Sequence, residues 1–152
     1  MSTKEAETLR NYIKDEKLHK IYAKVFDRIT IDTIHHLAKK GLFDVLEYVV
    51  STGKEAHVFR ARDVSGNFRA VKIYKISTSN FNNMQDYVKG DIRFHEIGHD
   101  KHDIVYAWTK KEFSNLNLAN STKVKVPMPL GFMNNVLVME FIGTDGEAAK
   151  TL

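Results

Sequence analysis

The 152-residue sequence predicts an α+β fold: two N-terminal helices, then a five-stranded, antiparallel, twisted sheet crossed by one large helix. Three observations predict it. Apolar residues recur at helical spacing over roughly the first 40 positions, and they then alternate with polar residues in short segments. Helical spacing returns from Ile104, before two final short apolar segments. Turn-forming residues separate the alternating segments, as in an antiparallel meander.

The N-terminal region predicts two helices. Apolar residues from Leu9 to Ile29 are spaced to form an amphipathic helix over roughly residues 4–28. Asp32 is placed to cap a second, shorter helix, which Gly41 would end. Two successive helices are also half of a helix-turn-helix DNA reader. Because both charge signs mix on the polar faces, we expect packing against the next domain and no direct DNA binding.

Five short segments rich in apolar residues predict the strands. Residues 51–54 form the loop after the first strand, and residues 64–67 form the next turn. Asn134 and Asn135 tolerate left-handed backbone angles, which suits a tight turn between the last two strands. The predicted strands are Val45–Val50, Ala56–Arg62, Phe68–Ile76, Met128–Met133 and Val136–Phe141, with the large helix from Ile104 to about Leu118.

Polarity divides the chain further. Polar residues dominate from residue 77 to about residue 103, so we expect a long mobile insertion there. We assign residues 1–41 to an N-terminal helical extension. Residues 42–152 form the sheet domain that carries the insertion.

Composition excludes several classes of protein. Without cysteine the chain forms no disulfide framework or thiolate metal site, which favours a reducing compartment. No apolar run approaches the roughly 18 residues of a membrane-spanning helix, so we expect a soluble, cytoplasmic protein with no membrane partner. The net charge of +4 mildly favours an anionic partner such as a nucleotide or RNA.

One lysine, Lys72, lies in the middle of a strand that otherwise alternates like a buried one. Alternation places Val71 and Ile73 on the core face, and Ala70 and Lys72 on the other. The small Ala70 leaves room for a flat ring, which Val58 on the neighbouring strand would cover, while Lys72 projects toward anionic oxygens. Protein kinases hold nucleotide phosphates with such a lysine. The alternative is an edge-strand lysine that extends to water.

Glu112 is the expected partner of this lysine. It lies on the same helical stripe as Trp108, so its carboxylate faces the sheet, where burial without a cation is costly. We therefore predict an ion pair between Lys72 and Glu112. The alternative is that Glu112 lies at the margin of the stripe and pairs with Lys110 or Lys111 in solvent.

Four segments resemble, in order, the RIO family of atypical serine/threonine protein kinases. They are STGKEA at 51–56, AVKIY at 70–74, KKEFSNL at 110–116 and VLVMEFIG at 136–143. The resemblance runs from about residue 42 to 143, and the two preceding helices resemble the subfamily that lacks a winged-helix domain. It implies a protein-kinase-like N-terminal lobe with one αC-type helix. It also implies ATP-dependent serine/threonine kinase or ATPase activity in maturing the small ribosomal subunit.

The resemblance also implies a set of site residues. Lys72 would bind the phosphates with Glu112 as its catalytic partner, and Met139 is similar to a gatekeeper. Because the phosphate loop has one glycine, Gly53, where ordinary kinases have three, hydroxyl groups must help to form the cradle. The implied ATP-binding residues are Ser51, Thr52, Gly53, Lys54, Val58, Ala70, Lys72 and Met139, with the backbones of Glu140 and Ile142 at the adenine edge.

No segment supplies the catalytic-loop Asp and Asn or the metal-binding Asp of a kinase. We therefore expect an N-terminal half whose C-terminal lobe, with the magnesium ligands, is absent, and which is inactive alone. The alternative is a non-catalytic nucleotide-binding or ribosome-interaction module.

A competing motif occurs at His95-Glu96-Ile97-Gly98-His99, which spells the zinc-protease signature. Gly98 weakens a helix there, and His102 stands where the extended signature has glycine. We therefore name no metal-binding residue. Adventitious metal binding by His95, His99 and His102 is the alternative.

Overall fold

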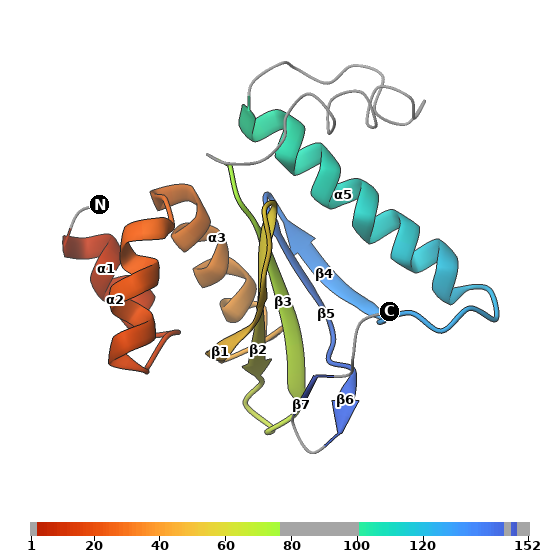
Figure 1. The fold of residues 1–152 in the computed structure, drawn as a ribbon, viewed down its shortest axis with the longest axis horizontal. Helices are drawn as coiled ribbons and strands as arrows, with labels where there is room; N and C mark the ends of the chain where they lie inside the picture. Colours follow the sequence, from red (N-terminus) through yellow and green to blue (C-terminus); the bar gives the residue numbers. More distant parts are fainter. Residues whose placement is uncertain (1–2, 77–100, 145–146, 149–152) are drawn as a thin grey trace.

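A computed structural model of the protein describes residues 3–76, 101–144 and 147–148. In this part of the chain, four helices and a five-stranded antiparallel sheet confirm the predicted fold class (Figure 1). The predicted insertion, apart from residues 101–103, lies outside the described residues, as does the histidine motif at 95–99. The helices are α1 (Thr3–Arg10), α2 (Glu16–Val25), α3 (Arg28–Lys39) and α5 (Lys101–Asn120).

The N-terminal region forms three helices, so the prediction of one helix over residues 4–28 was wrong. The chain leaves the helix after Arg10, and Asp15 begins a new one by accepting a hydrogen bond from the backbone N–H of Leu18 at 2.9 Å. An aspartate in this position satisfies an N–H group that the helix itself leaves unpaired. Apolar spacing continued across the break and concealed it.

The start of α3 also differs from the prediction. Asp27 caps it, and its side chain accepts from the backbone N–H of Thr30 at 2.8 Å. The predicted cap, Asp32, lies within α3 instead. The predicted end is confirmed, because Gly41 follows the helix with a φ of +85°, a left-handed angle that favours glycine.

The large sheet has the strand order β1-β2-β3-β5-β4, and every neighbouring pair is antiparallel. The alternation predicted for β3 is confirmed, because Val71 and Ile73 are buried in the core. A second, two-stranded sheet pairs β6 with β7, which the sequence did not predict. The strands are β1 (Val45–Thr52), β2 (Ala56–Arg62), β3 (Phe68–Tyr74), β4 (Pro129–Met133), β5 (Val136–Glu140), β6 (Gly143–Thr144) and β7 (Glu147–Ala148).

The N-terminal helices and the large sheet share one hydrophobic core. Helices α1 to α3 lie on one face of the sheet and α5 lies on the other (Figure 1). Burying the apolar faces of both layers removes them from water, which is the main favourable term in folding. A smaller cluster joins Tyr74 to Ile104 and Val105 on the α5 side. The fully buried members of the larger core include Leu9, Ile13, Ile31, Ile34, Phe59, Val71, Val136 and Val138.

The turn between β4 and β5 is tied to α3. Asn134 has a φ of +50°, as the sequence predicted for this pair, and its Nδ2 donates to Thr33 Oγ1 at 2.8 Å. Asn135 is buried, and its Nδ2 donates to Thr30 Oγ1 at 3.0 Å and to the backbone carbonyl of Tyr74 at 2.9 Å. The end of the sheet is thereby fixed against the helical layer.

Among the helices that the structure describes, none is long and apolar enough to cross a membrane.

Candidate functional site

The predicted contact between Lys72 and Glu112 is confirmed. Lys72 Nζ donates to Glu112 Oε1 at 2.9 Å, and each side chain is about a quarter exposed, at 26% and 27%. The same ammonium lies 5.0 Å from the ring centroid of Tyr74. A carboxylate and an aromatic face therefore both stabilise the positive charge.

Strand β3 and helix α5 set the positions of Lys72 and Glu112. Lys72 lies in the middle of β3, opposite Val58 of β2 and Leu137 of β5. Helix α5 is fixed against β4 by the rings of Phe113 and Phe132, whose centroids are 4.8 Å apart. Packing of the residue next to Glu112 thus sets where its carboxylate lies.

The loop between β1 and β2 lies close to the pair. Gly53 closes it by donating its backbone N–H to the carbonyl of Ala56 at 2.9 Å. A Cβ on Gly53 would meet no heavy atom nearer than that carbonyl oxygen, at 4.0 Å, and its φ lies outside the left-handed region. The loop conformation therefore does not itself require glycine, and the missing side chain leaves open space above the backbone.

A cavity of about 490 Å³ lies between this loop, β3 and α5. Its lining brings together most of the residues predicted at the phosphate end of the site. It also includes Tyr74 and Trp108, which sequence reasoning did not assign to the site. Both were within reach of a periodicity argument, because each shares a face with Lys72 or Glu112. The predicted residues that line the cavity are Ser51, Gly53, Lys54, Val58, Lys72 and Glu112.

The structure does not bring the Thr52 hydroxyl into this cavity. Thr52 Oγ1 lies 2.7 Å from Nδ1 of His57, a buried ring on the helical side of the sheet. Of the two hydroxyls predicted for the cradle, only that of Ser51 belongs to a residue that lines the cavity.

The predicted adenine end lies further along the same sheet face. Ala70 pairs with Met139, which is buried. The backbone N–H of Glu140 donates to the carbonyl of Met128 at 2.8 Å, and Ile142 is 45% exposed. None of these residues lines the cavity of about 490 Å³.

An arginine is held between two rings on this face. The Arg60 guanidinium lies 4.3 Å from the ring centroid of Tyr48 and 4.5 Å from that of Phe68. Its Nη2 is 3.0 Å from Glu47 Oε1. Arg60 lies opposite Ala70 in the pairing of β2 with β3, so its guanidinium makes the sheet face beside Ala70 polar.

The sequence model of the RIO domain matches residues 57–152, which is more than half of the chain. This chain belongs to the RIO family. The match begins in β2 and includes the strand, helix and hairpin that carry Lys72, Glu112 and Met139.

Named RIO relatives are serine/threonine-protein kinases. The chain is 44% identical over 143 residues to the RIO-type serine/threonine-protein kinase Rio1 of Haloferax volcanii. That match covers 94% of this chain and 49% of the relative, so the chain spans about half its length. It is also 36% identical to the human serine/threonine-protein kinase RIO1, covering 98% of this chain and 26% of the human protein.

The fold is that of the N-terminal lobe of a Rio kinase. A Rio2 kinase–ADP/Mg²⁺–phosphoaspartate complex from Chaetomium thermophilum has a TM-score of 0.57 at 19% identity. The similarity covers 74% of this chain and 32% of that one.

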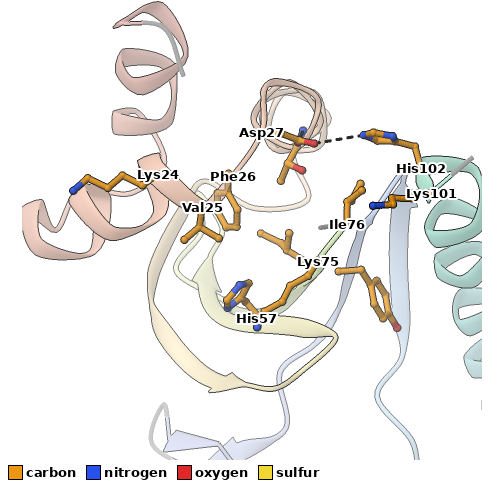
Figure 2. Close-up of a pocket in the computed structure, with 12 residues that line it drawn as sticks. Lys24, Val25, Phe26, Asp27, His57, Lys75, Ile76, Lys101 and His102 are labelled. Carbon is orange, nitrogen blue, oxygen red and sulfur yellow. Dashed lines mark hydrogen bonds and ion pairs between the residues drawn. The ribbon is translucent and has the colours of Figure 1, made fainter. Parts of the chain in front are cut away.

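A second cavity, of about 630 Å³, adjoins the first at Tyr74, which lines both (Figure 2). It opens between the end of α2, the start of α3, the start of β2, the end of β3 and the start of α5. His102 Nε2 lies 3.6 Å from Asp27 Oδ2 at this cavity. The apolar side chains of Phe26 and Ile73 line it, as does His57. None of the residues predicted for the RIO-type site lines this cavity.

The described residues contain no group of three or more His, Cys, Asp or Glu side chains that could hold a metal ion. Glu55 and Glu112 are the carboxylates among the residues that line the cavity of about 490 Å³, and Glu112 is engaged with Lys72.

Proposed function

We propose that the chain is the ATP-binding half of a RIO-type serine/threonine protein kinase or ATPase. The observation that carries the proposal is the Lys72–Glu112 ion pair at 2.9 Å, located at the cavity beneath the 51–56 loop. Kinases use a strand lysine held by a helix glutamate to bind the α- and β-phosphates. Membership of the RIO family supports the same assignment.

Different residues contact the phosphates and the adenine ring of the nucleotide. Lys72 donates to phosphate oxygens, and Glu112 restricts the ammonium to the position where those oxygens arrive. The Ser51 hydroxyl and the backbone N–H of Lys54 form the phosphate cradle, because the N–H of Gly53 is engaged with the Ala56 carbonyl. A loop that exposes backbone N–H groups binds anions in this way.

The adenine ring would lie further along the sheet. Val58 and Ala70 cover one of its faces, and Met139 limits its depth. The N–H of Glu140 is occupied by Met128. The carbonyl of Glu140 therefore accepts from the adenine amino group, and the N–H of Ile142 donates to the ring.

Magnesium does not fit the described residues as a protein-bound ion, because no acidic cluster is available among them. We assign its protein ligands, and the catalytic Asp and Asn, to a C-terminal lobe, in keeping with a chain that spans about half of its archaeal relative. The chain alone should therefore transfer no phosphoryl group above background. It should bind ATP at millimolar strength, on the order of −4 kcal/mol, because the described residues supply one wall of the site.

The biological setting is also a proposal. The family resemblance supports a role in maturing the small ribosomal subunit, with the pre-ribosomal particle as partner. The net charge of +4 agrees with an anionic partner of this kind.

Titration of the isotope-labelled chain with ATP, followed by NMR, tests the proposal. We expect shifts in the 51–56 loop and β3 that saturate in the millimolar range, and at least about tenfold weaker binding in Lys72→Met, since a charged hydrogen bond is lost. Lys39→Met, at an exposed position on α3, is the matched control. Absence of Lys72-dependent shifts would overturn the proposal, and micromolar binding to a monomer would replace it with a complete nucleotide-binding module.

A further inference from the structure

A buried histidine lies behind the loop, on the opposite side of the sheet from the lysine. His57 is near the start of β2, where it pairs with Thr52 of β1, and it is only 7% exposed. Its ring packs edge-on against Tyr22 of α2, with centroids 5.1 Å apart. The ring therefore touches both the helical layer and the strand that enters the loop.

Two hydroxyl groups converge on one nitrogen of this ring. His57 Nδ1 lies 2.7 Å from Thr52 Oγ1 and 3.2 Å from the hydroxyl of Tyr22. A neutral imidazole has one N–H and one lone pair, and either hydroxyl can donate to Nδ1. The shorter distance makes the bond to Thr52 the stronger of the two.

The ring is neutral at physiological pH. Burial, with a smaller contribution from the ammonium of Lys75, lowers the pKa of His57 from 6.5 to about 4. A neutral ring suits a buried position that offers no carboxylate partner among the described residues around it. The groups packed against it are the hydroxyls of Tyr22 and Thr52, the rings of Phe26 and Tyr22, and Lys75.

A second side chain, that of Lys75, forms a hydrogen bond to the loop from the same side of the sheet. Lys75, just after β3, donates its Nζ to the backbone carbonyl of Gly53 at 2.7 Å, and its N–H to the carbonyl of Glu55 at 2.8 Å. Figure 2 shows the Lys75 side chain running along the cavity toward His57. Two successive loop residues, Thr52 and Gly53, are thus held from behind by two different side chains.

We propose that His57 is a positioning residue for nucleotide binding: through Thr52 it holds the phosphate loop in its binding conformation and, through Tyr22, couples that conformation to helix α2. This inference rests on the proposed nucleotide function. Its physical basis is preorganisation, since a loop that is ordered before the ligand arrives loses less conformational entropy on binding. His57 touches no substrate and acts only through the loop.

Paired variants separate the hydrogen bond from packing. Thr52→Val removes the hydroxyl at constant shape, whereas Thr52→Ser keeps it. His57→Phe keeps an aromatic ring without a nitrogen, whereas His57→Asn places an amide near the position of Nδ1. Tyr22→Phe removes the more distant hydroxyl and keeps the ring.

The first readout is amide hydrogen exchange of Gly53 relative to Val71, whose buried strand reports global opening. We expect Thr52→Val and His57→Phe to speed Gly53 exchange about fivefold relative to Val71, as the loss of one hydrogen bond implies. Thr52→Ser and His57→Asn should stay near wild type, and Tyr22→Phe should lie between. The second readout is the ATP affinity by NMR, which should weaken by a similar factor in the same order.

The outcomes distinguish this inference from the function on which it rests. If wild type binds ATP through Lys72 but the Gly53-to-Val71 exchange ratio is unchanged in Thr52→Val and His57→Phe, the positioning role is overturned. A ranking in which His57→Phe is better than His57→Asn would also overturn it, because packing would then be what matters. If no ATP binding is seen while the exchange ratio follows the expected order, His57 orders the loop and the nucleotide function fails.

Discussion

The two faces of the large sheet are built from alternate residues of the same strands, yet they differ in the charged groups that they carry. On the face toward α1 to α3, Phe59, Val71 and Ile73 are buried in an apolar core. On the other face, Lys72 remains about a quarter exposed and holds Glu112. Along β3, a period of two thus separates the core residues Val71 and Ile73 from Lys72, the residue proposed to bind phosphate.

The difference shows where the chain tolerates polar groups. Charged and stacked side chains on the outer face keep contact with water, so their pairing costs little desolvation. On the inner face, His57 is a buried polar residue that is neutral and bonded to hydroxyls. The following variants test this division between the faces.

The largest effect is expected for Phe59→Ala on the inner face. Phe59 is fully buried, and its ring centroid lies 4.9 Å from that of Tyr22. We expect a loss of about 3–5 kcal/mol in the free energy of unfolding, because the truncation leaves a cavity. Urea denaturation measures it, with Val58→Ala on the outer face as a control that should cost about 1 kcal/mol. Equal losses at the two positions would contradict the division between the faces.

The next effect is a pH dependence caused by His57. Its pKa is about 4 in the folded protein and 6.5 when exposed, so the unfolded chain takes up the proton first as the pH falls. The contribution of the neutral ring is complete above pH 6.5 and is lost toward pH 4, by roughly 3 kcal/mol. Denaturation across this range should show it as a difference between wild type and His57→Asn. A difference that stays constant from pH 7 to pH 4 would show that the ring is not buried as described.

A smaller effect is expected for Glu112→Gln on the outer face. The ion pair is partly exposed, so the free energy of unfolding should change by less than about 1 kcal/mol. ATP affinity should fall about threefold to fivefold, because Lys72 loses the charge that positions it. Thermal denaturation and an NMR titration of one sample measure both. Should stability fall by several kcal/mol, the pair would belong to the core and not to the site.

The smallest effect is expected for Gly53→Ala. The added Cβ has 4.0 Å to its nearest neighbour and the backbone angle is not left-handed, so stability should change by less than about 1 kcal/mol. ATP should bind more weakly, because the methyl group occupies space above the loop that the phosphates need. Equal affinity in Gly53→Ala and wild type would place the phosphates elsewhere.

Much of the fold could be predicted because the longer strands are short apolar segments bounded by turn residues, and β2 also alternates in burial. The segment Ala56–Arg62 was predicted with its observed bounds. The helix break near Asp15 was missed because apolar spacing continues through it, and a cap is decided by one side chain and one N–H. The β6–β7 pair could not be predicted, since two-residue strands are too short to show a period.

The candidate site, like the fold, could be predicted in part. The contact between Lys72 and Glu112 could be predicted because each residue lies on a regular element whose period fixes its face. The orientation of Thr52 could not, because it depends on His57 and Tyr22, which reach it through the folded core. Whether a hydroxyl faces a ligand or a buried ring is set by tertiary contacts that local periodicity does not contain.

The asparagine turn between β4 and β5 has a consequence for the order in which the molecule assembles. Asn134 and Asn135 bond to Thr33 and Thr30 across sequence separations of 101 and 105 residues. Contacts of such long range close late, because the intervening chain must first be brought together. During synthesis α3 would therefore leave the ribosome with one side exposed, and that side would stay exposed until the β4–β5 hairpin is made. Slowing translation after α3 should lengthen this interval, in which the exposed apolar surface is open to chaperones.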